Sequence, residues 1–171
     1  AKDFYEILNG TNYLMVYGVG TPTENAAELN AAISESEKMP RFLGIKVSNT
    51  PIAMYAGQTY GLYVGSYVYY KILVDGIYNP FNPGSNNWVS VTEAKAKSTR
   101  TTLIVAPGEY NFGASAFVVD ASGINIVSLT GNSDVIIGST EVDSFSNYNY
   151  YGIKVTAEFI LIKGINCETN T

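Results

Sequence analysis

Short apolar runs recur through the second half of the chain, and this pattern constrains the fold more than any other feature. The runs occupy residues 103–106, 117–119, 124–129, 134–137, 153–155 and 159–162. They are rich in β-branched residues and lack helical spacing, so each is predicted to form a buried strand. Corners such as Pro107-Gly108 and Ala121-Ser122-Gly123 separate them. Strands that turn corners without hairpins favour a parallel β-helix.

Two of these stretches, residues 118–132 and 154–166, match each other in pattern. Each has a strand, a corner, a longer strand, and then Gly and Asn, and Gly131 and Gly164 stand 33 residues apart. That spacing suits one turn of a solenoid with an inserted loop. The predicted fold is therefore mainly β, a right-handed parallel β-helix start. The side chains expected inside it are Leu103, Val105, Val119, Ile126, Leu129, Ile136, Val155 and Leu161.

A helix is predicted over residues 22–38. Thr21 is placed to cap it, Pro22 suits its first position, and Glu24 completes a capping box. Leu29 and Ile33 lie on its apolar face. An open β-helix end exposes unpaired backbone, so we expect this helix to cover the N-terminal end as a lid.

The segment 41–100 is rich in tyrosine, glycine and asparagine. Residues 62–74 alternate between an aliphatic face and a tyrosine face, which predicts a long strand or a hairpin. Tyr63, Tyr67 and Tyr69 would then form an aromatic surface for a protein interface or for carbohydrate stacking. Packing of these rings against a neighbouring loop is the alternative. A short helix is expected near 90–98.

Composition excludes several classes of function. The chain has 171 residues, a net charge of -5 and no block of basic residues, which argues against nucleic-acid binding. Histidine is absent, so Ser-His-Asp triads and HExxH zinc sites cannot form. The single cysteine, Cys167, is expected to be a small core residue. No cofactor or metal site is expected. The N-terminal stretch shows no signal peptide, no membrane insertion is expected, and the absence of an initial Met indicates processing or excision.

Gly18-x-Gly20 between a strand and a helix invites a dinucleotide-binding interpretation. The third glycine of that motif is replaced by Thr23, and no strand ending in an acidic residue follows at the ribose-binding distance. A plain strand-to-helix turn is the preferred interpretation.

A strand, a glycine turn, the helix "TENAAELNAAI" and then "TTLIVAPGEYNF" with further strand runs resemble the start of pectate-lyase-like domains in bacteriophage tailspikes and tail fibres. The resemblance covers residues 13–38 and 101–171, and the tyrosine-rich segment departs from it as an insertion. The predicted organisation is therefore an N-terminal strand and capping helix over 1–40, the insertion over 41–100, and β-helix coils over 101–171.

The resemblance implies a phage virion structural and adhesion protein. It would assemble as a homotrimer with other virion proteins in the host cytoplasm and bind host surface polysaccharide. The alternative is a polysaccharide depolymerase whose catalytic coils lie beyond residue 171. Whether the chain is an enzyme stays open, because its coil carboxylates are scattered and no catalytic residue is assigned. The carboxylates and lysines considered are Glu109, Asp120, Asp134, Glu141, Asp143, Glu158, Lys154 and Lys163.

The chain ends on a strongly apolar run, residues 159–165, with no second amphipathic helix to cover it. Such an open end would template aggregation. We therefore expect further coils in a longer gene product, or a partner chain that docks on this end.

Overall fold

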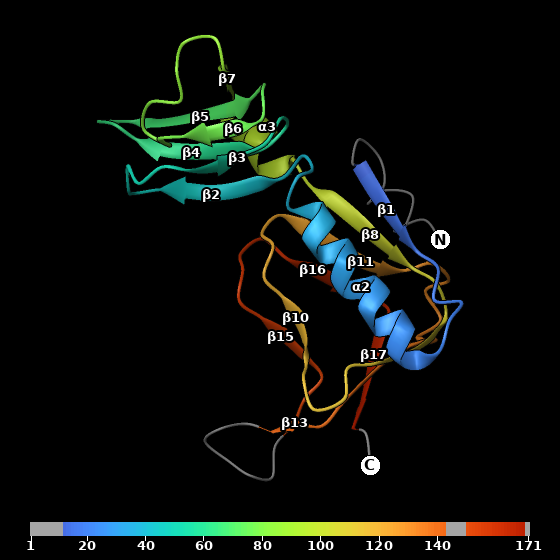
Figure 1. The fold of residues 1–171 in the computed structure, drawn as a ribbon. Helices are drawn as coiled ribbons and strands as arrows, with labels where there is room; N and C mark the ends of the chain where they lie inside the picture. The colour runs from blue at the N-terminus through green and yellow to red at the C-terminus, as the bar shows by residue number, and fades with distance from the viewer. Residues whose placement is uncertain (1–11, 143–149, 170–171) are drawn as a thin grey trace.

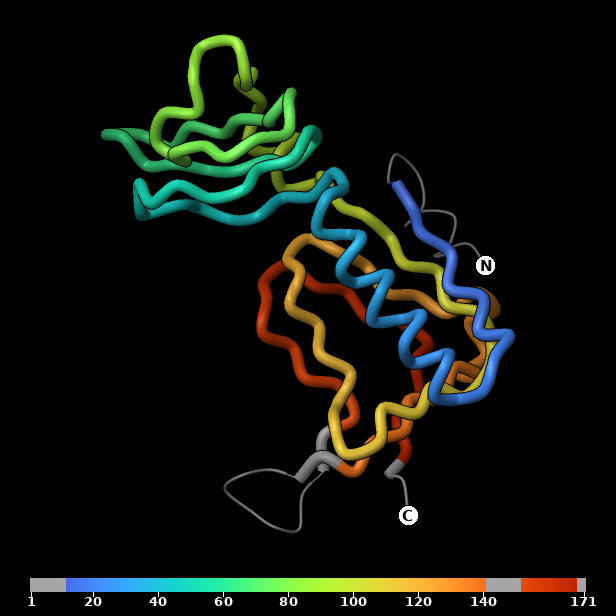
Figure 2. Tube along the Cα trace, in the orientation of Figure 1, coloured from blue at the N-terminus to red at the C-terminus, as the bar shows by residue number. Residues whose placement is uncertain are grey.

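The protein is described here by a computed structural model covering residues 12–142 and 150–169. Its elements form two groups (Figure 1): parallel sheets covered by one long helix, and a group of antiparallel and mixed sheets. The tube in Figure 2 shows the second group, cyan to green, standing beyond one end of that helix. Residues 41–98 therefore fold mainly against themselves, with the rest of the described chain below them.

Three sheets in the first group are parallel. The largest has the order β1-β8-β11-β16, and the others are β17-β12-β9 and β10-β15. Because strands from distant parts of the sequence pair side by side, each sheet is built from successive passes of the chain. The strands are β1 (Asn12–Val16), β8 (Thr101–Val105), β9 (Gly108–Asn111), β10 (Phe117–Val119), β11 (Ile124–Ser128), β12 (Val135–Ser139), β15 (Ile153–Val155), β16 (Leu161–Lys163) and β17 (Ile165–Thr169).

The parallel sheets share one apolar core. It includes Leu103, Val105, Ile126, Val135 and Ile137, each at most 1% exposed. Side chains alternate across a strand, so these residues occupy every second position of β8, β11 and β12. Burial of this apolar face stabilises the association of strands that come from distant parts of the sequence.

Helix α2 (Pro22–Ser36) covers this core. Its start has the predicted capping box, in which Thr21 and Glu24 bond each other's backbone N–H groups. Leu29 and Ile33 belong to the same apolar cluster as the strands, as the sequence predicted. The helix was expected to extend to residue 38 but ends two residues earlier.

The second group contains the sheet β2-β4-β5-β7, in which β2 and β4 are parallel and the other pairs antiparallel. It has its own core around Tyr60, Tyr70 and Ile72. Helix α3 (Glu93–Ser98) packs on this sheet. It lies within the segment, near 90–98, where a short helix was expected. The strands of this group are β2 (Phe42–Lys46), β3 (Ile52–Met54), β4 (Thr59–Tyr63), β5 (Tyr67–Ile72), β6 (Gly76–Tyr78) and β7 (Trp88–Val91). A separate antiparallel pair, β13 (Glu141–Val142) and β14 (Tyr150–Tyr151), is not part of it.

The predicted right-handed parallel β-helix start, with its capping helix and β insertion, is wrong as a description of this fold. The described strands form several short sheets, parallel and mixed, and none of these sheets closes or continues as a solenoid. A solenoid needs at least about three stacked equivalent repeats to bury a continuous core. Here one parallel sheet has only two strands, and a large part of the chain goes into sheets with antiparallel pairs. The division at residues 40 and 100 stays a prediction.

The predicted core is correct for half of its residues. Leu103, Val105, Val119 and Ile126 are buried, but Leu129, Val155 and Leu161 are exposed and Ile136 is only half-buried. Ile136 points away from the core because its neighbours Val135 and Ile137 point into it. Val155 and Leu161 belong to strands paired on one side only. Leu129 follows the end of β11.

Candidate functional site

The tyrosine surface, defined as Tyr63, Tyr67 and Tyr69, lies on a hairpin formed by β4 and β5. Tyr63 pairs directly with Tyr67, and Tyr69 is two residues further along β5. Paired residues and residues two apart share a face of a sheet, so the three side chains point the same way. The ring centroids of Tyr63 and Tyr67 are 5.0 Å apart, and those of Tyr67 and Tyr69 are 6.5 Å apart. The rings therefore form one continuous row.

The members of this row differ in exposure. Tyr63 and Tyr67 are 61% and 62% exposed, whereas Tyr69 is 6% exposed. The Tyr69 ring packs against Phe42 of β2, with 6.1 Å between centroids, and its hydroxyl donates a hydrogen bond to Glu93. Only Tyr63 and Tyr67 are therefore open to a ligand or partner, and Tyr69 anchors the row to the sheet.

A charged pair borders the row at its buried end. Lys97 and Glu93 form an i,i+4 salt bridge of 2.7 Å on α3. Hydrogen bonding and charge attraction from Glu93 raise the pKa of the Lys97 ammonium, and Lys97 in turn lowers the pKa of Glu93. Both side chains are exposed, so the pair contributes little stability but keeps this border polar.

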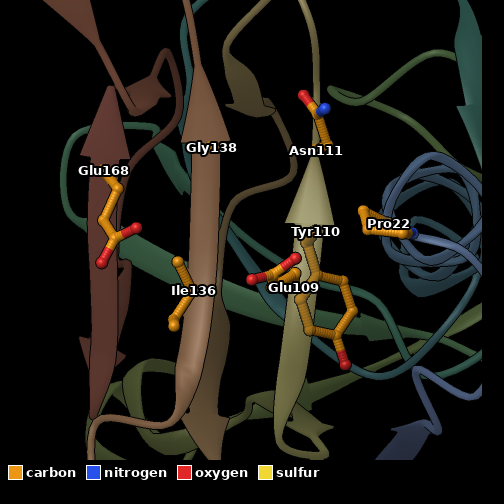
Figure 3. Close-up of a pocket in the computed structure, with 7 residues that line it drawn as sticks. All are labelled: Pro22, Glu109, Tyr110, Asn111, Ile136, Gly138 and Glu168. Atoms are coloured by element: carbon orange, nitrogen blue, oxygen red, sulfur yellow. The ribbon is translucent and has the colours of Figure 1, made fainter. Parts of the chain in front are cut away.

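Glu109 and Glu168 lie on the outer face of a parallel sheet, in a small pocket of about 150 Å³. Figure 3 shows their carboxylates on either side of Ile136, with Gly138 further along β12. Glu109 pairs in register with Ile136, and Glu168 with Gly138. Because Gly138 has no side chain, it leaves a hollow between the flanking strands β9 and β17. Sequence reasoning considered Glu109 but missed Glu168, whose strand partner is not visible in the sequence.

None of the other described carboxylates lines this pocket. Asp134 accepts hydrogen bonds from Thr130 and Ser128 within its own turn, which is a structural role. Asp120 lies apart, at the cleft between the two groups of sheets. Asp143 and the side chain of Glu141 lie outside the described residues. In the part of the chain that is described, no three His, Cys, Asp or Glu side chains are grouped so as to hold a metal ion.

The Gly18-x-Gly20 turn has its backbone donors occupied. The N–H groups of Tyr17 and Gly18 donate to the Glu28 carboxylate over 2.8 and 3.0 Å, and the Gly20 N–H donates to Asn25. A phosphate would need these same donors and would meet the negative charge of Glu28. The geometry therefore favours the plain strand-to-helix turn over a dinucleotide site.

Cys167 is exposed, so the expectation of a core cysteine is wrong. It lies on β17, which is an edge strand of its sheet. An edge strand lacks the second neighbour that would cover such a side chain.

No family model matches the chain, and its comparison with curated proteins and with solved structures gives no match either. Among residues 12–142 and 150–169, no helix combines the length and apolar character needed to cross a membrane.

Proposed function

We propose that this chain is a structural and adhesion protein of the bacteriophage tail-fibre type, which works by binding rather than by turnover. It assembles in the host cytoplasm as a homotrimer, joins other virion proteins and contacts host surface polysaccharide in the virion. The sequence resemblance of residues 13–38 and 101–171 supports this proposal. The exposed pair Tyr63 and Tyr67 is the observation that carries its binding function.

The tyrosine surface is proposed to be a contact between subunits. Tyrosine is enriched at protein interfaces because a large apolar ring ends in a hydroxyl group that tolerates water. Val64, in the hairpin turn beside Tyr63, is 66% exposed. An exposed aliphatic side chain next to the rings suits a protein partner better than a sugar, which requires hydrogen-bonding groups around the stacked ring.

Sedimentation velocity on the full chain tests this proposal. Tyr63→Ser combined with Tyr67→Ser is expected to weaken assembly at least about tenfold, because interface tyrosines are commonly energetic hot spots. Tyr13→Ser with Tyr17→Ser is the matched control. Tyr13 on β1 is 58% exposed and Tyr17, which directly follows β1, is 60% exposed, and neither belongs to the hairpin. Binding of host surface polysaccharide is expected to be unchanged in both variants. Loss of polysaccharide binding with assembly intact would favour a receptor site instead.

A polysaccharide-cleaving activity is the second candidate function, and the placement of Glu109 and Glu168 favours it. Their strands are two steps apart in the sheet, roughly 9 to 10 Å, with an offset of about 7 Å along the strands. Glutamate side chains on such backbones can bring their carboxylates to the roughly 6.5 to 9.5 Å of an inverting glycosidase. Release of reducing ends by the wild-type chain, abolished in Glu109→Gln and in Glu168→Gln, would support this candidate.

A further inference from the structure

A further pocket, of about 210 Å³, lies against the sheet β2-β4-β5-β7, beside α3. Thr59 of β4 and Lys71 of β5 line it, and they pair directly with each other, so their side chains share one face of the sheet. Lys95 of α3 and Arg100, which lies between α3 and β8, line the pocket as well. The pocket therefore forms where the sheet, the short helix and the connection to the parallel sheets meet.

The lining of this pocket carries three cations and no carboxylate. Lys71, Lys95 and Arg100 supply the positive charges, and none of the described residues that line the pocket is Asp or Glu. The chain has ten Lys and Arg residues against fifteen Asp and Glu, so the charge of the pocket is opposite to that of the chain as a whole. Charges of one sign that gather in a hollow concentrate the potential there. The pocket is therefore expected to attract anions.

These three cations are not neutralised by ion pairs. In the part of the chain that is described, the one salt bridge joins Lys97 to Glu93 and includes none of them. Burial lowers the pKa of the Arg100 guanidinium, and no acidic side chain of the described residues opposes that effect. A partly buried charge without a counterion is costly, so an anion that entered the pocket would be stabilised.

The Arg100 side chain is held in place but keeps an open donor. Its Nε atom donates to Oδ1 of Asn125 over 2.7 Å, and its Nη2 atom donates to the carbonyl oxygens of Ile124, over 3.1 Å, and Phe159. The other terminal nitrogen, Nη1, donates to none of the described residues. The hydroxyl group of Thr59, a residue that is only 2% exposed, is bonded to none of them either. The pocket thus contains two fixed side chains with donors to spare.

The end of α3 beside the pocket has its nearest carbonyl group occupied. The carbonyl oxygen of Lys95 accepts hydrogen bonds from the hydroxyl groups of Ser98 and Thr99, over 3.0 and 2.9 Å. Unpaired carbonyl groups at a helix C-terminus repel negative charge. Because these hydroxyl groups cap the Lys95 carbonyl, the helix end is less unfavourable for an anion than an open one.

We propose that this pocket binds a doubly charged tetrahedral oxyanion, namely a phosphate group that is either free or part of a phosphate monoester. Arg100 donates to it from Nη1, the ammonium groups of Lys71 and Lys95 close over its outer oxygens, and the Thr59 hydroxyl donates a further hydrogen bond. A volume of about 210 Å³ is below the roughly 300 Å³ at which sites for drug-sized ligands begin, so it suits one small group. The site goes beyond the proposed function and does not depend on it.

An NMR titration of the full chain with sodium phosphate, and with sodium acetate at the same ionic strength, tests the proposal. Phosphate is expected to shift the amide signals of Thr59, Lys71 and Arg100 and to bind at least about tenfold more tightly than acetate, which carries a single charge. Glucose 6-phosphate, with glucose as its uncharged analogue, distinguishes the two sources of the group. An ester that binds more tightly than phosphate identifies a monoester ligand, and one that binds more weakly identifies the free ion.

Lys71→Gln combined with Lys95→Gln is expected to weaken phosphate binding at least about tenfold, because each change removes a charged hydrogen bond. Both residues are exposed, so the fold should tolerate the changes. Lys38→Gln combined with Lys97→Gln is the matched control. It removes the same charge from two exposed lysines that do not line the pocket, and it is expected to change affinity less than about twofold.

Equal affinity of the two double variants would overturn the proposal, because the effect would then come from net charge alone. Equal binding of acetate and phosphate, or no shift of the three amide signals, would overturn it as well. Raising the concentration of sodium chloride screens attraction between charges, so phosphate affinity of the wild-type chain is expected to fall. Affinity that does not respond to salt would contradict a site built from these cations.

Discussion

The hydroxyl group of Tyr110 donates a hydrogen bond to the carbonyl oxygen of Ala106, 2.7 Å away, across the Pro107-Gly108 corner. The same hydroxyl lies against Gly18, where a side chain would collide with it. This contact joins the turn before α2 to the corner between β8 and β9. The Pro-Gly corner is therefore held by tertiary packing as well as by its own turn residues.

Gly18→Ala is expected to destabilise the fold by about 2 to 4 kcal/mol, measured by urea unfolding. The positive φ of Gly18, 60°, disfavours any side chain, and the Tyr110 hydroxyl leaves no room for one. Gly113→Ala is the matched control, because Gly113 has nearly the same φ, 62°, but open space around it. Its cost is expected to be about 1 to 2 kcal/mol. Equal losses in both variants would contradict the packing argument.

Stability is expected to fall between about pH 10 and pH 12, in part through Tyr110. Burial raises the pKa of Tyr110 to about 12, and the unfolded chain loses this proton near pH 10. Deprotonation therefore favours the unfolded state, so the contribution is complete below pH 10 and is lost as pH rises toward 12.

Urea unfolding of wild type and Tyr110→Phe across this pH range measures that contribution. The variant is expected to lose about 1 kcal/mol at neutral pH, the typical value of a hydrogen bond. It is also expected to show a shallower alkaline decline, by about 1 to 3 kcal/mol. Tyr60 and Tyr70 belong to the other core, and their pKa values are also raised by burial, so part of the decline remains. Identical alkaline slopes would count against the assignment to Tyr110.

Leu29→Ala is expected to destabilise the chain by about 2 to 5 kcal/mol in thermal or urea unfolding. Leu29 is 1% exposed and lies in the cluster that joins α2 to the parallel sheets. Leu73→Ala is the control, because Leu73 is 43% exposed and its truncation should cost less than about 1 kcal/mol. A negligible effect at Leu29 would mean that α2 does not close the core.

Tyr69→Ser and Tyr67→Ser are expected to change the stability of the fold by different amounts, although the two residues are neighbours in one row. Tyr69 is buried against Phe42, so its truncation should cost about 3 to 5 kcal/mol of stability. Tyr67 is 62% exposed, and its change should alter stability by less than about 1 kcal/mol. Similar melting temperatures for both variants would show that Tyr69 is not an anchor.

The candidate site was visible in the sequence only in part. Alternation of residues 62–74 placed Tyr63, Tyr67 and Tyr69 on one face, since that depends only on strand geometry. The burial of Tyr69 was not visible, because Phe42 and Glu93, the residues that contact it, are more than 20 positions away. Glu168 was missed for the same reason: its relation to Glu109 exists only through their shared neighbour β12.

The sequence by itself determined the local features of this protein: the capping box of Thr21 and Glu24, the face of α2 that bears Leu29 and Ile33, and the strands around the Pro107-Gly108 corner. Each depends on residues within a few positions of one another, so their spacing is sufficient information. Only the tertiary structure decided which strands pair, which edges stay exposed and that Arg41, Lys46 and Asp120 line one cleft. These outcomes depend on contacts between distant segments. The apolar runs resemble one another, so their local strand propensities do not select one strand pairing over another.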